Sequence, residues 1–127
     1  MKKITITALL LMTCSLFASI KSVSTNDLKN LKISDSSLVI IDARTTQWFK
    51  GEIIQGAIWL PSDSSDETIL AALPSKDATI VTYCFSESCP LAGHLAERLV
   101  KMGYKNVSEY SAGFKEWKSE QLPVRSY

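Results

Sequence analysis

The sequence predicts an α/β fold with a mainly parallel sheet and helices on both faces. Short apolar runs typical of buried strands alternate along the chain with segments of helical spacing. The run at residues 38–41 has no polar alternation, which is typical of a strand covered on both faces. A length of 127 residues and a hydrophobic content of 46% fit one domain with its own core.

Residues 1–18 are expected to be a secretory signal peptide. Lys2 and Lys3 precede a mostly apolar run, and Ala18 is a small residue suitable for cleavage. The run is short for a membrane span and is interrupted by threonine and serine, so cleavage is favoured over an uncleaved anchor. We therefore expect a periplasmic or secreted domain over residues 19–127, with no stable membrane insertion after cleavage.

The charge of the chain argues against nucleic acid as a partner. The formal net charge is +1, and removing two lysines with the signal peptide leaves 12 basic residues, 14 less two, against 13 acidic ones. Nucleic-acid binding would need a basic face. Near-neutral charge leaves the oligomeric state unknown. Cys14 would leave with the signal peptide, so the mature chain keeps Cys84 and Cys89 in a compartment where thiols can be oxidised.

Start and stop signals place three short helices and two strands in the first half of the mature chain. The helix signals are a capping serine or threonine before the first two helices, Gly51 after the second and Pro74 after the third. The strands are two apolar runs, of which the second follows a glycine-bearing turn. In chain order we expect a helix at 25–32, a strand at 38–41, a helix at 47–50, a strand at 57–60 and a helix at 67–73.

The second half repeats the alternation of strand and helix. Residues 80–83 form a short β-branched and aromatic run, and from Leu91 leucines recur four residues apart up to a stop at Gly103. A further strand is expected at residues 107–110, a last helix at 113–117, and a closing segment at 122–124. In such folds, sites tend to lie beyond the carboxyl ends of the strands.

Cys84 lies at such an end, between the strand at 80–83 and the helix that begins at Leu91. The loop between them has backbone N–H groups that can converge on a sulfur or a bound anion, together with the free N–H groups of the first helical turn. This setting lowers the pKa of a thiol, because the positive end of the helix dipole favours thiolate over thiol. We therefore expect a nucleophilic Cys84, with an inert core cysteine as the alternative.

Four blocks of the sequence, in order, carry a resemblance to a known family. They are Leu38 to Arg44, an apolar strand ending in Asp-x-Arg; Gly51 to Pro61, a glycine turn and strand; Ile80 to Cys84; and Gly103 to Val107 with Gly113 to Trp117. On these blocks the mature chain resembles a single-domain rhodanese over nearly all of its length. The resemblance implies the three-layer rhodanese-like fold.

The resemblance also implies sulfurtransferase activity without a cofactor. In this family a cysteine at the position of Cys84 takes sulfur from a sulfane donor, carries it as a persulfide and passes it to a thiophilic acceptor. The implied partners are a small sulfur donor or a protein persulfide or thiol. The implied substrate-binding loop comprises Phe85, Ser86, Glu87, Ser88, Pro90 and Leu91.

The loop departs from the family pattern, in which four residues separate the cysteine from an arginine. Cys89 stands at that spacing, and an alignment counted back from Gly103 places Leu91 there instead. The loop carries Glu87 and no base, so we expect it to repel an anionic donor such as thiosulfate. A neutral or protein-bound persulfide would be less affected. Arg44 is a candidate for the missing charge, although pairing with Asp42 is the favoured interpretation.

Three functions stay open at this point. The leading hypothesis is an exported sulfurtransferase that carries a persulfide on Cys84. The second is thiol–disulfide exchange, because Cys89 is favoured as a partner of Cys84, either as a resolving thiol or as a structural disulfide. The third is a non-catalytic rhodanese-fold module that binds a partner. Cys84, Cys89 and His94 lack an evident fourth ligand, so no metal site is expected.

Overall fold

A computed structural model describes residues 20–127, so the expected signal peptide at residues 1–18 lies outside the described residues. Strands and helices alternate along most of this range. The elements are β1 (Lys21–Ser22), α1 (Thr25–Ser34), β2 (Val39–Asp42), β3 (Glu52–Ile54), β4 (Ile58–Trp59), α2 (Asp66–Ala72), β5 (Thr79–Tyr83), α3 (Leu91–Lys101), β6 (Asn106–Tyr110), α4 (Gly113–Ser119) and β7 (Val124–Ser126).

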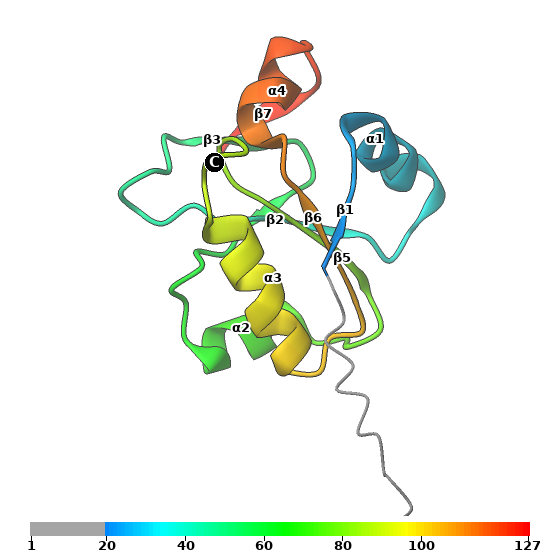
Figure 1. The fold of residues 1–127 in the computed structure, drawn as a ribbon, viewed down its shortest axis with the longest axis vertical. Helices are drawn as coiled ribbons and strands as arrows, with labels where there is room; N and C mark the ends of the chain where they lie inside the picture. Colours follow the sequence, from blue (N-terminus) through cyan, green and yellow to red (C-terminus); the bar gives the residue numbers. More distant parts are fainter. Residues whose placement is uncertain (1–19) are drawn as a thin grey trace, which may run out of the picture.

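Five strands form a sheet in the order β1-β6-β5-β2-β4, and every neighbouring pair in it is parallel (Figure 1). β5 is the central strand, with β2 on one side and β6 on the other. β3 and β7 form a separate antiparallel pair. The predicted α/β class with a mainly parallel sheet is therefore confirmed, and the carboxyl end of β5 opens at the middle of the sheet edge.

Helices cover both faces of the sheet. On one face, Leu28 of α1 and Phe114 and Trp117 of α4 pack in a core with apolar side chains of β2 and β5. On the other face, side chains of α2 and α3 such as Ile69 and Leu95 form a second core against the same strands. Because successive side chains of a strand point to opposite faces, one buried strand serves both cores. Within residues 20–127, no helix has the length and apolar character needed to cross a bilayer.

The start of α1 follows from its sequence. The Ser24 hydroxyl accepts a hydrogen bond from the Asp27 N–H, and the Asp27 carboxylate accepts one from the Ser24 N–H, both at 3.0 Å. This reciprocal pair is a capping box, which satisfies two N–H groups of the first turn. Hydrogen bonding to the Asp27 carboxylate by the Ser24 backbone N–H, and then by the Ser24 side chain, lowers the pKa of this exposed carboxyl. The helix runs to Ser34, slightly beyond the predicted end before Ile33.

The helix predicted at residues 47–50 is wrong. The segment forms a single turn, in which the N–H groups of Trp48 and Phe49 both reach the carbonyl of Thr45. Phe49 instead stacks on Trp59, with ring centroids 4.3 Å apart, and Gly51 adopts a φ of +87° that leads directly into β3. The short strands β1, β3 and β7 differ from the prediction, which has no strand at these positions, since each pairs with a strand far along the chain.

Candidate active site

Cys84 directly follows β5, at the carboxyl edge of the sheet. The strand is fixed on both sides by parallel pairing, with Tyr83 in register with Asp42 of β2 and Tyr110 of β6. The Cys84 side chain is only 2% exposed and packs in the core beneath α3, yet it also lines a pocket at this edge of the sheet. The sulfur therefore lies at the boundary between the core and that pocket.

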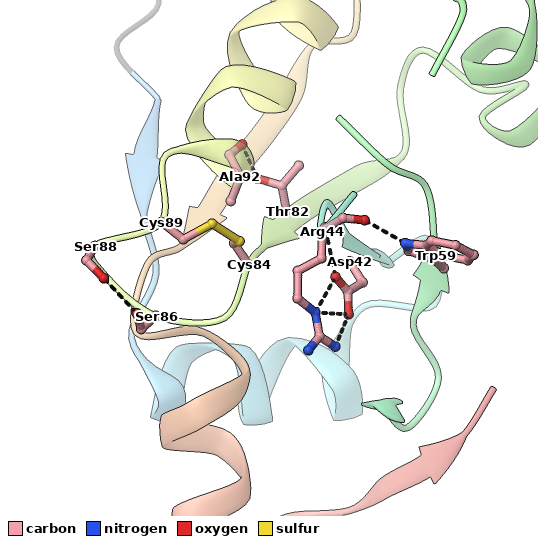
Figure 2. Close-up of a disulfide and its surroundings, with 9 residues drawn as sticks. All are labelled: Asp42, Arg44, Trp59, Thr82, Cys84, Ser86, Ser88, Cys89 and Ala92. Atoms are coloured by element: carbon pink, nitrogen blue, oxygen red, sulfur yellow. Dashed lines mark hydrogen bonds and ion pairs between the residues drawn. A yellow bond between two sulfur atoms is a disulfide. The ribbon is translucent and has the colours of Figure 1, made fainter. Parts of the chain in front are cut away.

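A disulfide joins Cys84 and Cys89 and closes the intervening loop into a ring (Figure 2). The two Cα atoms are 6.2 Å apart, which is within the usual range for a disulfide. Inside the ring, the Cys89 N–H donates to the Ser86 carbonyl at 3.0 Å, and the hydroxyls of Ser86 and Ser88 are hydrogen-bonded to each other at 3.0 Å. The structure is thus the oxidised form, and reduction must precede any nucleophilic attack by Cys84.

The ring and the start of α3 carry unused hydrogen-bond donors. Among the described residues, the backbone N–H groups of residues 85–88 and 91–93 have no acceptor in the protein, and Pro90 caps α3 without a side-chain hydrogen bond. Several of these residues line the pocket that Cys84 lines. Free N–H groups at a helix start favour a bound anion, including an anionic sulfur.

The last helix holds the start of the loop from the other side. The N–H groups of Phe114 and Lys115 donate to the carbonyls of Cys84 and Phe85, each at 2.9 Å. Gly113 permits this approach, since a Cβ atom there would lie 2.7 Å from the Cys84 carbonyl oxygen and 2.8 Å from that of Phe85. Its φ of +75° is also a conformation that favours glycine. α4 therefore positions the backbone on which Cys84 sits.

Arg44 is held by Asp42. The two side chains are buried and form a bidentate pair, with Arg44 Nη2 at 2.6 Å and Nε at 3.0 Å from the carboxylate oxygens (Figure 2). Nη2 also donates to the Glu52 carbonyl at 2.7 Å, and the guanidinium lies over the rings of Phe49 and Phe114. Arg44 lines the pocket, but most of its charge is balanced by Asp42. The pairing favoured from the sequence is thus present.

Tyr83 supports the same edge of the sheet. Its hydroxyl accepts a hydrogen bond of 3.0 Å from the Ile54 N–H and so connects β5 to β3. Burial, and then the nearby Asp42 carboxylate, raise the pKa of Tyr83 well above its ordinary value. The phenol therefore stays neutral and acts as a structural contact.

The pocket beside Cys84 has a volume of about 870 Å³ and is formed by three separate segments. The active-site loop contributes Phe85, Ser86, Ser88, Cys89, Pro90 and Leu91, which are loop residues expected from the sequence. Glu87 does not line it and instead borders a second pocket, with Asp27 and Glu116. The acidic side chain of the loop thus lies away from the Cys84 pocket.

Three lysines line the Cys84 pocket that sequence reasoning did not identify. Lys50 comes from the segment after β2, and Lys115 and Lys118 come from α4. Their presence changes the charge balance on which the expected repulsion of anions depended. The order of the elements could have revealed these lysines. Each of their segments follows a strand that flanks β5, and parallel strands end at the same edge of the sheet.

Within residues 20–127, no group of three His, Cys, Asp or Glu side chains is arranged to hold a metal ion.

Comparison with known proteins agrees with this architecture. Residues 24–120 match the family model described as a rhodanese-like domain. The chain is 36% identical over 76 residues to the thiosulfate sulfurtransferase PspE of Escherichia coli (strain K12), a match that covers 60% of this chain and 70% of that protein. A solved structure, a rhodanese with anions from E. coli, is 31% identical with a TM-score of 0.56. The match covers 71% of this chain and 99% of that chain. The BH2092 protein from Bacillus halodurans is 26% identical, with a TM-score of 0.74 and coverage of 84% and 77%.

Proposed function

The chain belongs to the rhodanese-like family, and from this premise we propose that it transfers sulfane sulfur as a persulfide on Cys84. The observation that carries the proposal is the position of this residue. Cys84 follows the central strand, at the base of a pocket and at the start of a loop rich in unused N–H donors. Such donors stabilise negative charge on the sulfur that attacks and on the sulfur that is carried.

The reaction starts once the disulfide is reduced to two thiols. The Cys84 thiolate attacks the outer sulfur of a donor R–S–SH; a new S–S bond forms on Cys84, the S–S bond of the donor breaks, and R–S⁻ leaves. The proton stays on the transferred sulfur. An acceptor thiolate then attacks that outer sulfur and releases Cys84 as a thiolate. With thiosulfate as donor, the leaving group is sulfite.

Cys89 offers a second way to discharge the persulfide. Its thiolate can attack the Cys84 sulfur, which forms the Cys84–Cys89 disulfide and releases HS⁻. This step would form the same Cys84–Cys89 bond that the structure contains, and direct oxidation of the two thiols would form it as well. The same pair supports the second candidate function, thiol–disulfide exchange. There, an outside thiolate attacks the half-exposed Cys89 more readily than the buried Cys84.

Export is part of the proposal. The disulfide is consistent with an oxidising compartment, where such bonds persist. N-terminal sequencing of the protein isolated from its own cell should begin at Ser19. A chain that retains Lys2 and Lys3 would contradict cleavage.

A transfer assay tests the function. Reduced protein is mixed with thiosulfate or polysulfide and with cyanide or a thiol as acceptor. We expect turnover that is abolished in Cys84→Ser. In Cys89→Ser, transfer should persist without formation of the disulfide. If no donor gives turnover that depends on Cys84, while oxidised protein exchanges disulfides with a reduced dithiol, exchange is the better assignment. If neither reaction occurs, both enzyme proposals fail and the hypothesis of a non-catalytic module that binds a partner is favoured.

A further inference from the structure

Exposed aromatic side chains gather at the Cys84 pocket. Large apolar side chains usually avoid water, and few of them are exposed over the described part of the chain. Two of these few, Trp48 at 58% exposed and Phe85 at 48%, line the pocket together with Phe114 and Leu91. Its volume of about 870 Å³ lies in the range of small-molecule sites. The walls therefore suit a ligand with an apolar body.

The rim of the same pocket is positively charged. Lys50, Lys115 and Lys118 line it, and Glu52 is the acidic residue in the lining. Glu52 is paired with Lys118 at 2.8 Å, so its charge is already balanced. Lys50 contacts only the Gln47 carbonyl, at 3.5 Å, and the Lys115 side chain has no acceptor among the described residues. Two exposed ammonium groups are thus available to a negative group on the ligand.

We propose that the sulfur donor is a small organic persulfide whose carbon part is apolar and carries a carboxylate. This inference rests on the proposed function and specifies its substrate. The apolar part would contact Trp48 and Phe85, and the carboxylate would reach Lys50 or Lys115. The outer sulfur would then meet the Cys84 thiolate, and the carboxylate-bearing thiolate would leave as in the reaction above. Inorganic thiosulfate has no carbon part and would leave the aromatic walls uncovered.

The experiment measures binding without sulfur transfer. The disulfide form is titrated separately with three probes. Naphthoate has an aromatic ring system and a carboxylate, naphthalenemethanol has the same ring system without the carboxylate, and acetate has the carboxylate without the ring system. The readout is the NMR shift of the Trp48 indole. Naphthoate should bind at least about threefold more tightly than the alcohol, because of the lysines. It should bind at least about tenfold more tightly than acetate, because of the buried ring.

Matched variants locate the site. Trp48→Ala should weaken naphthoate about fivefold, since an aromatic contact is lost. Because this change removes the indole signal, its affinity is read by calorimetry. Lys115→Glu should weaken naphthoate about threefold and leave the alcohol unchanged. The controls are Ile33→Ala, which removes an apolar side chain that is 87% exposed outside the pocket, and Lys101→Glu, an exposed lysine of α3. Both should bind as the parent does.

Failure of this inference differs from failure of the proposed function. If the three probes bind equally, or if the pocket variants behave as the controls do, the donor class is wrong, even where Cys84 still accepts sulfur from thiosulfate. If naphthoate is selected as described but Cys84 accepts sulfur from no donor, the sulfurtransferase proposal fails. The donor assignment then falls with it, while the ligand chemistry of the pocket stands.

Discussion

The main-chain N–H of Phe114 donates a hydrogen bond of 2.9 Å to the carbonyl oxygen of Cys84. This contact fastens the residue that follows the central strand to the start of the last helix. It is possible only because the residue before Phe114 is a glycine, which lets the two backbones approach. The position of the sulfur thus depends on α4 as well as on β5.

Gly113→Ala should destabilise the fold and weaken the active loop. The new Cβ atom would lie 2.7 Å from the Cys84 carbonyl oxygen, and φ at this residue is +75°. We expect a loss of about 2 kcal/mol or more in the free energy of unfolding, together with slower sulfur loading. Gly103→Ala is the control, because Gly103 has a φ of +97° but no atom within 4 Å of the added Cβ. Urea denaturation of both variants measures the difference. Equal losses would show that the close approach to the Cys84 carbonyl adds no cost.

Asp42→Asn should be strongly destabilising, because it leaves the Arg44 guanidinium buried without its counter-charge. Breaking a buried ion pair in this way costs about 3–5 kcal/mol. The matched control is Asp66→Asn, which breaks the more exposed pair with Arg98, also 2.6 Å long, and should cost less than about 1 kcal/mol. Chemical denaturation gives both values. A loss at Asp42 as small as that at Asp66 would contradict the structural role assigned to the Arg44 pair.

Reduction should lower the stability of the parent protein and leave Cys89→Ser unaffected. The disulfide closes a short loop, with a sequence separation of 5, and a cross-link of this length stabilises by about 2 kcal/mol in the chain-entropy model. Thermal unfolding with and without a dithiol reductant measures the effect. An equal response of Cys89→Ser to the reductant would assign the change to something other than this bond.

Glu109→Gln should stabilise the protein increasingly as pH rises. Burial, and then the nearby Glu97 carboxylate, raise the pKa of Glu109 above 4.5 in the folded state. The folded state therefore holds this proton more tightly than the unfolded state does. The resulting stability is present below the unfolded pKa and is lost as pH rises through the folded pKa. The glutamine stays neutral throughout. Melting temperatures measured from acid to neutral pH should diverge in favour of the variant; parallel curves would argue against the raised pKa.

The longer helices and the central strands follow from local sequence, whereas the pocket does not. The capping residue Ser24 and the leucines of α3 predict their helices directly, and the apolar run before Asp42 predicts a buried strand. A turn at residues 45–49 stands in place of the helix predicted at 47–50, because Phe49 stacks on Trp59 and a single helical turn has little stability of its own. A tertiary contact therefore sets the conformation of that segment.

The lysines of the pocket show the same limit. Lys50 and Lys115 lie 65 positions apart in the sequence and come to one rim because β2 and β6 both flank β5. Glu87 is close to Cys84 in sequence but borders a different pocket. The net charge of the loop sequence therefore differs from the net charge of the side chains that surround a donor beside the Cys84 sulfur.

The central claim is that Cys84 accepts sulfur, and intact-mass spectrometry of the reduced Cys89→Ser variant tests it most directly. In this variant the adduct cannot be discharged as a disulfide. After incubation with polysulfide and removal of excess donor, we predict a gain of one sulfur atom, reversed by a thiol reductant and absent in a variant that also carries Cys84→Ser. An unchanged mass, or the same gain in both variants, would contradict it.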